Sequence, residues 1–398
     1  MKVSIGYGLE HADYEVPTES VIAGRRQPSA PPIADLGRAI RDALETPIGF
    51  PALRKALTPD DHVVIVADEH LPHQEEMLSA IVKYLIEARI QPAAIAILYP
   101  STPESRETVE LPSHPEIRVE VHDPTNRKKL SYLATTRRGR RLYLNRTAVD
   151  ADQLIVLSGR SYDPLLGYSG AVGALFPTLS DAETKLQMNG ELSNDVPAKE
   201  PWPARREAEE VAWLLGAPFM IQVIEGSGDE ILHVLGGLAD TGVDGERLLD
   251  ARWRVSVDRR ADVVVAGVSG DPVRHTITDL AHALVSAARV VKPRGRIILL
   301  SQAQPKLGPG MQLLRSADEP GNALKNLRRE KPSDIAPAFQ WASAAEHATI
   351  SMLSGLEPEV AEELFTTPLT EPGQVIPLLQ GADVLFLDDA HKSIAVMD

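Results

Sequence analysis

The 398-residue sequence contains no cysteine. This absence excludes disulfide bonds, cysteine nucleophiles, and zinc or iron–sulfur sites with thiolate ligands. The sequence also lacks an apolar run of about 18 residues, so no membrane-spanning helix is expected. No apolar segment follows a basic start, and a secretory signal is therefore not expected either.

An excess of positive charge is missing as well. Lysine and arginine together number 41 against 56 aspartate and glutamate residues, which gives a formal net charge of -15. Such a chain repels the phosphate backbone of nucleic acids and the surface of anionic membranes. We therefore expect a cytoplasmic protein whose partner is neither a nucleic acid nor a membrane.

Short apolar runs alternate with helical patterns along the chain. The expected strands are residues 62–68, 93–98, 153–159, 261–270, 295–301 and 382–389. The expected helices include residues 73–90 and 278–291, where apolar residues recur with helical spacing. Strands and helices that alternate in this way are typical of α/β folds with parallel sheets. We predict two α/β domains with mainly parallel sheets, residues 1–255 and 256–398, with a cleft between them.

The segment GYSGAVGALFP (167–177) follows the strand predicted at 153–159 and is rich in glycine. Its glycines Gly167, Gly170 and Gly173 have the spacing GxxGxxG, which differs from the GxGxxG of dinucleotide-binding turns. No GK[ST] follows, so the segment is not a phosphate-binding P-loop. Two interpretations stay open: a tight turn that requires glycine, or a loop that faces a ligand.

Six segments, spread over nearly the whole chain, follow one another in a characteristic order. They are IGYGLEHADYEVP (5–17), ALETPIGFPALRKAL (43–57), VVIVADEHLP (63–72), GYSGAVGALFP (167–177), DLAHALVSAARVVKPRGRIILL (279–300) and QWASAAEHATISMLSG (340–355). In this order they resemble the LarA-type lactate racemase family. The resemblance implies a lactate-racemase-like fold of two α/β domains with a cleft between them.

The resemblance also implies a particular chemistry. The family uses a nickel pincer, a nicotinic-acid-derived mononucleotide tethered to a lysine, which accepts a hydride from the Cα of a 2-hydroxy acid and returns it to either face. Two histidines act as alternating bases, a task that suits imidazole because its pKa lies near neutrality. A further histidine of the family ligates the metal.

Most of these chemical groups are missing from this sequence. Asp68 in DEHLP matches the family, but Leu71 stands where the family has an arginine. Gly173 stands at the position of the tethering lysine, and Asn189 stands at or near that of the metal-ligand histidine. Because glycine has no amine and asparagine is a poor nickel ligand beside imidazole, no cofactor is expected.

The two catalytic histidines of the family correspond to Tyr99 and Asp163. Their reference pKa values, about 10 and about 4, lie on either side of neutrality rather than near it. His282 and Val285 stand where the family has glutamine and lysine, and Trp341 matches an aromatic residue of the family's cleft. The resemblance therefore supplies the scaffold without most of the chemistry.

These residues define the predicted site. The catalytic candidates are Asp68, His70, Tyr99 and Asp163, the loop on the cofactor side contributes Gly167, Ser169, Gly170 and Gly173, and the substrate-binding candidates are His282 and Trp341.

A metal site is a weaker alternative. Asp68, His70 and His73 cluster at a strand-to-helix turn, where open α/β sheets place ligands. The competing interpretation is a solvated turn beside the positive end of the helix dipole. Lys185, the first lysine after the glycine-rich loop, is either a replacement tether or an ordinary surface lysine. Scattered histidines such as His391 show no ligand spacing and receive no role.

Three functions stay open. The first is a protein that has lost the nickel pincer and binds a small hydroxy acid or related metabolite in the cleft. The second is an enzyme of the same scaffold with altered isomerase or lyase chemistry on a hydroxy acid. The third is an active nickel-pincer racemase with rearranged anchors. A second copy of the chain or a paralogue of the family are the protein partners considered, and neither follows from the residues themselves.

Overall fold

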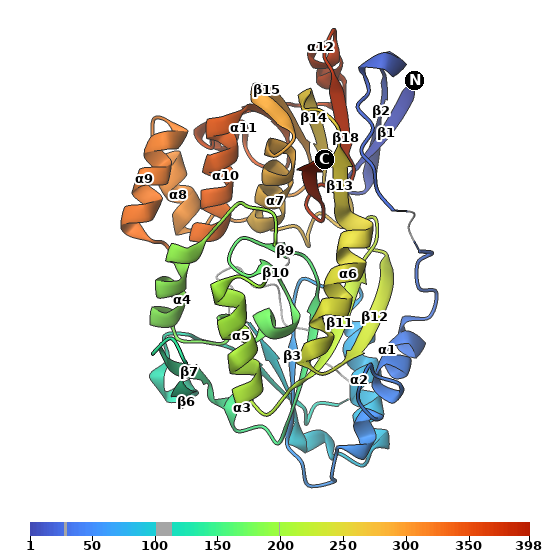
Figure 1. Ribbon diagram of the computed structural model, residues 1–398, viewed down its shortest axis with the longest axis vertical. Coiled ribbons are helices and arrows are strands. Elements are labelled where there is room, and N and C mark those ends of the chain that lie inside the picture. Colours follow the sequence, from blue (N-terminus) through green and yellow to red (C-terminus); the bar gives the residue numbers. More distant parts are fainter. Residues whose placement is uncertain (28–29, 101–113, 199) are drawn as a thin grey trace.

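The computed structural model describes residues 1–27, 30–100, 114–198 and 200–398. The chain forms two α/β units, one around a six-stranded sheet and the other around a five-stranded sheet. In Figure 1 the first unit lies below the second, and both chain termini lie at the upper unit. The prediction of two α/β domains with mainly parallel sheets is confirmed.

The six-stranded sheet has the order β12-β11-β8-β3-β4-β5, in which the edge strand β12 alone is antiparallel to its neighbour. Its strands are β3 (Val63–Ala67), β4 (Ile95–Tyr99), β5 (Arg118–Val121), β8 (Gln153–Gly159), β11 (Phe219–Glu225) and β12 (Ile231–Gly237). Every residue of β3 and β4 is buried. Continuous apolar strands of this kind are expected where helices cover both faces of a parallel sheet.

The helices cover the two faces of this sheet separately. One face packs on α1 (Leu36–Glu45) and α2 (Gln74–Glu87), and the other packs on α5 (Pro203–Leu214) and the 3-10 helix η5 (Ala171–Ala174). The remaining elements of this unit are β6 (Leu130–Thr135), β7 (Arg141–Asn145), α3 (Arg146–Val149), β9 (Tyr162–Asp163), β10 (Gly167–Tyr168), α4 (Ala182–Met188) and α6 (Gly242–Trp253).

The five-stranded sheet is parallel throughout and has the order β17-β16-β15-β14-β18. Its strands are β14 (Ala261–Gly267), β15 (Val291–Leu300), β16 (Thr349–Leu353), β17 (Thr366–Pro368) and β18 (Val384–Leu387). The helices α7 (Ile277–Ala288) and α10 (Ile335–His347) pack on one face of the sheet. The other helices are α8 (Pro309–Arg315), α9 (Pro320–Glu330), α11 (Pro358–Glu363) and α12 (Ile376–Leu379).

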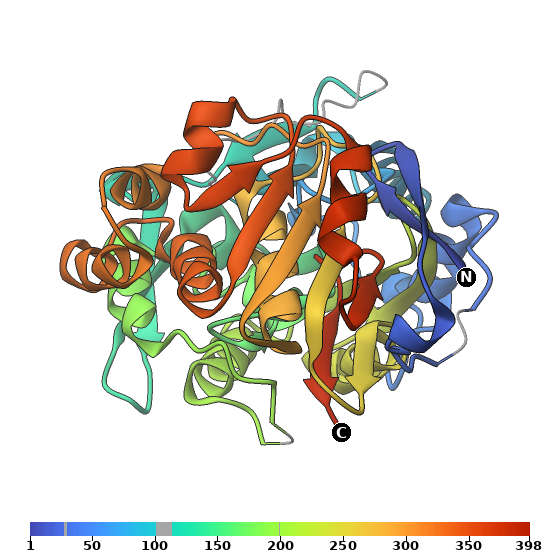
Figure 2. The ribbon, with the colours of Figure 1, turned by 90° about the horizontal axis from the view of Figure 1, so that it is seen from above.

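The N-terminal hairpin belongs to the second unit, which corrects the start of the predicted first domain, 1–255. Strands β1 (Lys2–Tyr7) and β2 (Glu10–Glu15) pack their apolar side chains against β14 and β15, with Ile5 and Tyr7 beside Val263 and Ile298. Figure 2 shows this hairpin alongside the second unit. The chain leaves the first unit at the end of α6, and β13 (Arg254–Val257) then pairs with β19 (Ile394–Met397).

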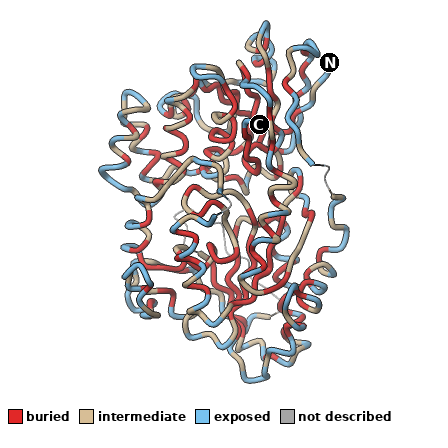
Figure 3. The backbone as a smooth tube through the Cα atoms, viewed as in Figure 1, coloured by how far each residue is buried: buried red, intermediate tan, exposed pale blue. Residues whose placement is uncertain are grey.

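Figure 3 shows that buried residues concentrate in the two sheets and in the helix faces against them. Among the described helices, none is long and apolar enough to cross a membrane.

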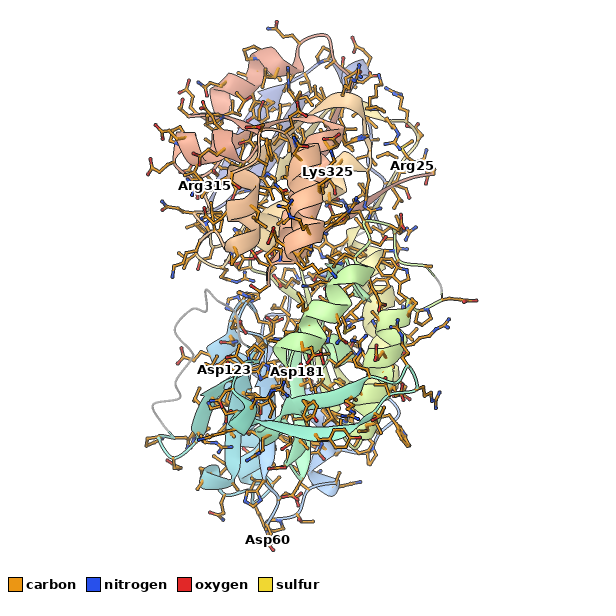
Figure 4. All side chains as sticks on the ribbon, turned by 90° about the vertical axis from the view of Figure 1, so that its left-hand side faces the viewer. Arg25, Asp60, Asp123, Asp181, Arg315 and Lys325 are labelled. Carbon is orange, nitrogen blue, oxygen red and sulfur yellow. The ribbon has the colours of Figure 1, made fainter. Side chains whose placement is uncertain are left out.

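In the side view of Figure 4, Asp60 marks the lower end of the first unit, and Arg315 and Lys325 lie on helices of the second. Buried polar residues such as His275 and Lys392 instead line a cavity where the units meet.

Candidate ligand site between the two units

A cavity of about 220 Å³ lies where the two units meet. The first unit contributes residues that follow the carboxyl ends of β3, β8 and β11, among them Asp68, His70 and Glu225. The second unit contributes the start of α7 and the segment between β18 and β19. Open α/β sheets bind ligands at the carboxyl ends of their strands, so the cavity has the expected place for a site.

Four histidines line this cavity: His70, His275, His282 and His391. In each of them one ring nitrogen is buried and has no hydrogen-bond partner within the described part of the chain; these atoms are Nδ1 of His70, His275 and His391 and Nε2 of His282. Buried polar atoms normally have partners, because leaving them unpaired costs about 1–3 kcal/mol each. Each of these four cavity-lining histidines therefore has one ring nitrogen that is not engaged in a hydrogen bond within the described residues.

The start of α7 fixes two of these histidines. Thr276 and Asp279 form a capping box. The carboxylate of Asp279 accepts a hydrogen bond from the backbone N–H of Thr276, and the hydroxyl of Thr276 accepts one from the backbone N–H of Thr278. His275 precedes this cap, and His282 lies about one helical turn beyond Asp279 on the same side of the helix. Although burial acts to raise the pKa of Asp279, His275 and the hydrogen bonds from Thr276 hold it below its ordinary value. A carboxylate therefore lies beside the histidines.

Burial favours the uncharged form of three of these histidines, His275, His282 and His391. It lowers the pKa of His275 and His282, against the opposing effect of Asp279 on both. It also lowers the pKa of His391 well below the ordinary value, and the nearby Lys392 adds to this effect. A neutral imidazole offers one donor and one acceptor, which suits a ligand that carries both a hydroxyl and a carboxylate.

Two cations of the second unit hold the units together beside the cavity. Arg274 pairs with Glu225 at 3.2 Å and with Asp229, and its Nη2 donates to the carbonyl of His70 at 2.9 Å. Lys392 pairs with the same Glu225 at 3.0 Å. Because both cations already have carboxylate partners, they shape and close the cavity rather than leave a free positive charge in it.

The glycine-rich loop is fixed against the carboxyl end of β8. Gly170 has φ +70°, and a Cβ at this position would lie 2.1 Å from the carbonyl oxygen of Gly159. The hydroxyls of Ser169 and Ser161 are 2.5 Å apart, and the carbonyl of Ser169 accepts a hydrogen bond from Arg160. The turn therefore requires glycine, as the first interpretation predicted, and it also faces a cavity.

A second cavity, of about 240 Å³, lies on the side of this loop that faces β3. It shares Asp68, His70 and Ser169 with the first cavity, and Gly170 and Gly173 contribute to its wall. Gly167 instead lines a smaller cavity of about 30 Å³. The loop residues predicted for the cofactor side thus lie at cavities, but not all at the same one.

The structure brings several predicted catalytic residues together. Asp68 lines both larger cavities with His70, and its two carboxylate oxygens accept hydrogen bonds from the backbone N–H groups of His70 and Gly159, at 3.0 and 3.2 Å. Asp163 lines the second cavity, where its Oδ1 accepts from the backbone of Leu165 and Leu166. Both aspartates therefore have a structural task as well as a place at the site.

Two predicted site residues lie elsewhere. Trp341 is fully buried in the core of the second unit, where its Nε1 donates to the carbonyl of Leu364 at 2.8 Å; the expectation that it forms a cleft wall is corrected. Tyr99 is 1% exposed and packs in the core of the first unit, so its placement does not support a catalytic role. Residues 101–105, which follow Tyr99 in the segment expected to carry a catalytic base, lie outside the described residues.

The structure gives no support to the weak metal alternative. Across the described ranges, no group of three or more histidine, aspartate or glutamate residues is arranged to hold a metal ion. His73 begins α2 with a left-handed φ of 54°, and its Nε2 lies 3.1 Å from the carbonyl of Asp229. It is therefore turned to the interface rather than toward Asp68 and His70 as a third ligand.

Sequence reasoning missed ten polar residues of the first cavity: Arg160, Ser161, Glu225, Arg274, His275, Thr276, Thr278, Asp279, His391 and Lys392. A usable signal existed for some of them. Arg160 directly follows the strand predicted at 153–159, and His391 and Lys392 follow closely after the strand predicted at 382–389. The rule that ligands bind at the carboxyl ends of parallel strands would have selected these positions.

Comparison with known proteins finds similarity to lactate racemases. Residues 7–194 match the lactate racemase N-terminal domain family. The chain is 20% identical over 402 aligned positions to lactate racemase from Thermoanaerobacterium thermosaccharolyticum, and the match covers 95% of this chain and 94% of that protein. Residues 7–194 thus match the N-terminal domain of lactate racemases, and the chain is similar to a LarA-type lactate racemase over nearly its whole length.

Solved structures agree with this similarity. The apoprotein of the T. thermosaccharolyticum lactate racemase matches with a TM-score of 0.80 and 18% identity, over 99% of this chain and all of that one. A protein from Thermotoga maritima matches with a TM-score of 0.67 and 12% identity, over 91% of this chain and 98% of that one. At these identities the likeness shows a lactate-racemase-like fold.

The residues of this chain do not fit a lysine-tethered pincer. Gly173, at the expected tether position, lines the second cavity with no side chain, and a Cβ there would already lie 2.8 Å from Cδ1 of Leu166. Lys392 lines the first cavity, but its Nζ is held by Glu225 and by the carbonyls of Gly226 and Gly228. No amine lining either cavity in the described residues is thus available for a tether.

Two further positions bear on the pincer of the LarA-type family. Asn189, at or near the expected metal-ligand position, begins the short 3-10 helix after α4 and lines none of the cavities described above. Lys185 lies on α4, and burial lowers its pKa to about 8, against the opposing effect of Asp181 and Glu69. It likewise lines neither large cavity, so its role as a replacement tether gains no support from its position.

Proposed function

We propose that this LarA-type protein binds a small 2-hydroxy acid in the cavity between its two units, without a lysine-tethered nickel pincer. The observation that carries the proposal is the set of four uncommitted histidine nitrogens around a cavity of about 220 Å³. A 2-hydroxy acid has the matching groups, because its carboxylate accepts hydrogen bonds and its hydroxyl both donates and accepts. The cavity volume lies below the usual range for drug-sized ligands, which favours a small metabolite.

Similarity to a lactate racemase supports the ligand class. The relative from T. thermosaccharolyticum is a lactate racemase, and its substrate is a 2-hydroxy acid. The glycine at position 173 supports the second half of the proposal, since a glycine cannot form the amine tether. The protein retains the place for the acid and lacks the group that would hold the cofactor.

The test is a thermal-shift screen with glycolate, D-lactate, L-lactate and 2-hydroxybutyrate. A ligand that binds only the native state at about 100 times its Kd stabilises it by about 2.7 kcal/mol, which raises Tm by several degrees. The variant His391→Asn should lose this shift. His62→Asn is the matched control, because the side chain of His62 is 74% exposed and lies outside the cavity. A screen in which none of these acids raises Tm would refute the proposal.

The missing tether has its own test. The protein is co-expressed with the enzymes that synthesise the pincer, and its intact mass and nickel content are measured. We expect the mass of the unmodified chain and no stoichiometric nickel. An added mass of mononucleotide size with one nickel per chain would overturn this part of the proposal, and loss of that mass in Lys185→Arg would then identify the tether.

Catalysis is a second candidate, and the histidines favour it because imidazole is the usual acid–base group near neutral pH. In this version the protein is an isomerase or lyase that acts on the same acid. Incubation of a bound acid in deuterated water, followed by proton NMR, distinguishes the two. Loss of the signal of the hydrogen on Cα, or appearance of a new product, would support an enzyme, and an unchanged spectrum would support a binding protein.

A further inference from the structure

The histidines contributed by the second unit form one buried cluster, His275, His282 and His391. The rings of His275 and His391 meet edge to face, with centroids 5.1 Å apart and an interplanar angle of 68°. Both residues are 7% exposed, and each has a buried Nδ1 without a partner among the described residues. His282 lies on the next turn of α7 with its Nε2 equally unpaired. Two separate segments thus bring three histidines, each with one unpaired ring nitrogen, to the wall of the same cavity.

Formal charges on the cavity wall cancel when these histidines are neutral. The wall carries three carboxylates and three permanent cations, namely Asp68, Glu225, Asp279, Arg160, Arg274 and Lys392. Each of the three cations is already bonded to a carboxylate: Arg274 and Lys392 to Glu225, and Arg160 to Glu246. The remaining charges that face the cluster are Asp163 beside His282 and Asp229 beside His275. Each cation on this wall is thus already paired and leaves no excess positive charge for an anion.

A carboxylate that enters such a cavity adds one negative charge where little water can screen it. An unpaired buried charge costs several kcal/mol, so the site must gain a positive charge. The buried imidazoles are the groups able to provide it, because a neighbouring anion favours their protonated form. Protonation also gives each ring a second N–H donor, which the unpaired nitrogens in the cluster can direct to the carboxylate.

We infer that a monoanionic acid enters this cavity together with one proton, which the cluster His275–His282–His391 holds. The inference rests on the proposed function and adds a selection rule to it. One carboxylate with one proton leaves the net charge of the cavity unchanged, whereas a dicarboxylate or a phosphorylated acid brings a second charge that the cluster must also neutralise. The cluster therefore determines specificity for monocarboxylates.

The test is calorimetric titration of the wild-type protein with L-lactate, D-lactate and glycolate at pH 7.5 in phosphate and in Tris. These buffers differ in ionisation enthalpy, so the difference in observed heat gives the number of protons taken up. We expect close to one proton per bound lactate or glycolate. The affinity should rise by about tenfold for each unit by which the pH falls between 8 and 7, since binding consumes a proton. Malate, a dianion of similar chemistry, should bind at least tenfold more weakly at pH 7.5.

Variants locate the proton. His275→Gln and His391→Gln keep a polar side chain but cannot accept a proton, so each should reduce proton uptake and flatten the pH dependence, and the double variant should do so most. His62→Gln is the control and should behave as the wild type. If circular dichroism shows that a variant fails to fold, the two-buffer experiment on the wild type still determines whether binding takes up a proton.

The outcomes separate the inference from the proposed function. Binding of lactate or glycolate without proton uptake would overturn the inference and leave the proposed function standing. Proton uptake that persists in a triple variant, which combines His275→Gln, His282→Gln and His391→Gln, would overturn the assignment to this cluster. A titration in which none of the three acids binds at any pH between 5.5 and 8 would overturn both.

Discussion

Alanine in place of Gly170 tests whether the glycine-rich loop shapes the site. Gly170 has φ +70° and ψ -169°, a region that side chains other than that of glycine rarely adopt, at a cost of about 1–3 kcal/mol. The new Cβ would also lie 2.1 Å from the carbonyl oxygen of Gly159 and 3.1 Å from Oγ of Ser158. Overpacking of this kind costs about 1–3 kcal/mol more, so the total is about 2–6 kcal/mol.

The loop has no easy way to relieve this clash. The carbonyl of Gly159 ends a central strand of the sheet, and the backbone N–H of the next residue in the loop, Ala171, donates to Oγ of Ser158 at 2.8 Å. A shift of Gly170 would therefore break this hydrogen bond and displace Ser169, which lines both large cavities. We expect Gly170→Ala to lower the free energy of unfolding and also to weaken binding of the acid.

The assay is urea unfolding of three glycine variants, followed by titration with the acid found in the thermal-shift screen. Gly139→Ala has the same kind of backbone strain, with φ +82°, but nothing lies within 4 Å of its Cβ, so it should lose about 1–2 kcal/mol. Gly190→Ala has neither strain nor a close neighbour and should lie within about 0.5 kcal/mol of the wild type. If Gly170→Ala is as stable as Gly139→Ala and binds the acid normally, the assignment of this loop is wrong.

Three further predictions concern stability and the interface. Burial lowers the pKa of His122 to about 4, so the unfolded state, with its ordinary pKa of about 6.5, binds the proton first as the pH falls. The free energy of unfolding should therefore fall by about 2 kcal/mol through this group between neutral pH and pH 5. Urea unfolding of His122→Gln should show a smaller loss of stability over the same pH range. Arg274→Ala removes the arginine partner of the half-buried Asp229 and one of the two cations beside Glu225, so it should cost about 1–3 kcal/mol and abolish binding of the acid. The surface pair lost in Arg315→Ala should cost no more than about 1 kcal/mol in the same denaturation assay. Trp341→Phe removes a buried hydrogen bond and should lower the free energy of unfolding by about 1–3 kcal/mol, while calorimetry shows an unchanged Kd for the acid. A higher Kd would indicate that Trp341 contributes to the binding site after all.

Much of the fold could be predicted from local pattern. The strand predicted at 153–159 is β8 with the same limits, and the helix predicted at 278–291 is α7 with a shift of one to three residues. Continuous apolar runs of β-branched residues and helical spacing of apolar residues are local signals, so they need no knowledge of distant contacts. The glycine-rich loop was located for the same reason.

The candidate site was predicted only in part. Asp68 and His70 follow a strand that the sequence makes plain, and they do line the cavity. Trp341 was assigned through the resemblance, and the amphipathic helix that carries it turns its indole inward to the core. A tryptophan on a helix gives no signal in one sequence that separates a cleft wall from a core position, because both environments are apolar.

The amino-acid sequence by itself determined that this is an α/β chain without thiol chemistry, that position 173 offers no amine, and that the chain resembles the LarA-type lactate racemases. Only the tertiary structure decided which residues share a cavity. His70, His282 and His391 are far apart in the chain, and they meet because two sheets built from different parts of it face each other. The N-terminal hairpin packs on the second unit because burial of apolar surface stabilises contacts between segments that are close in space, however far apart they are in the sequence.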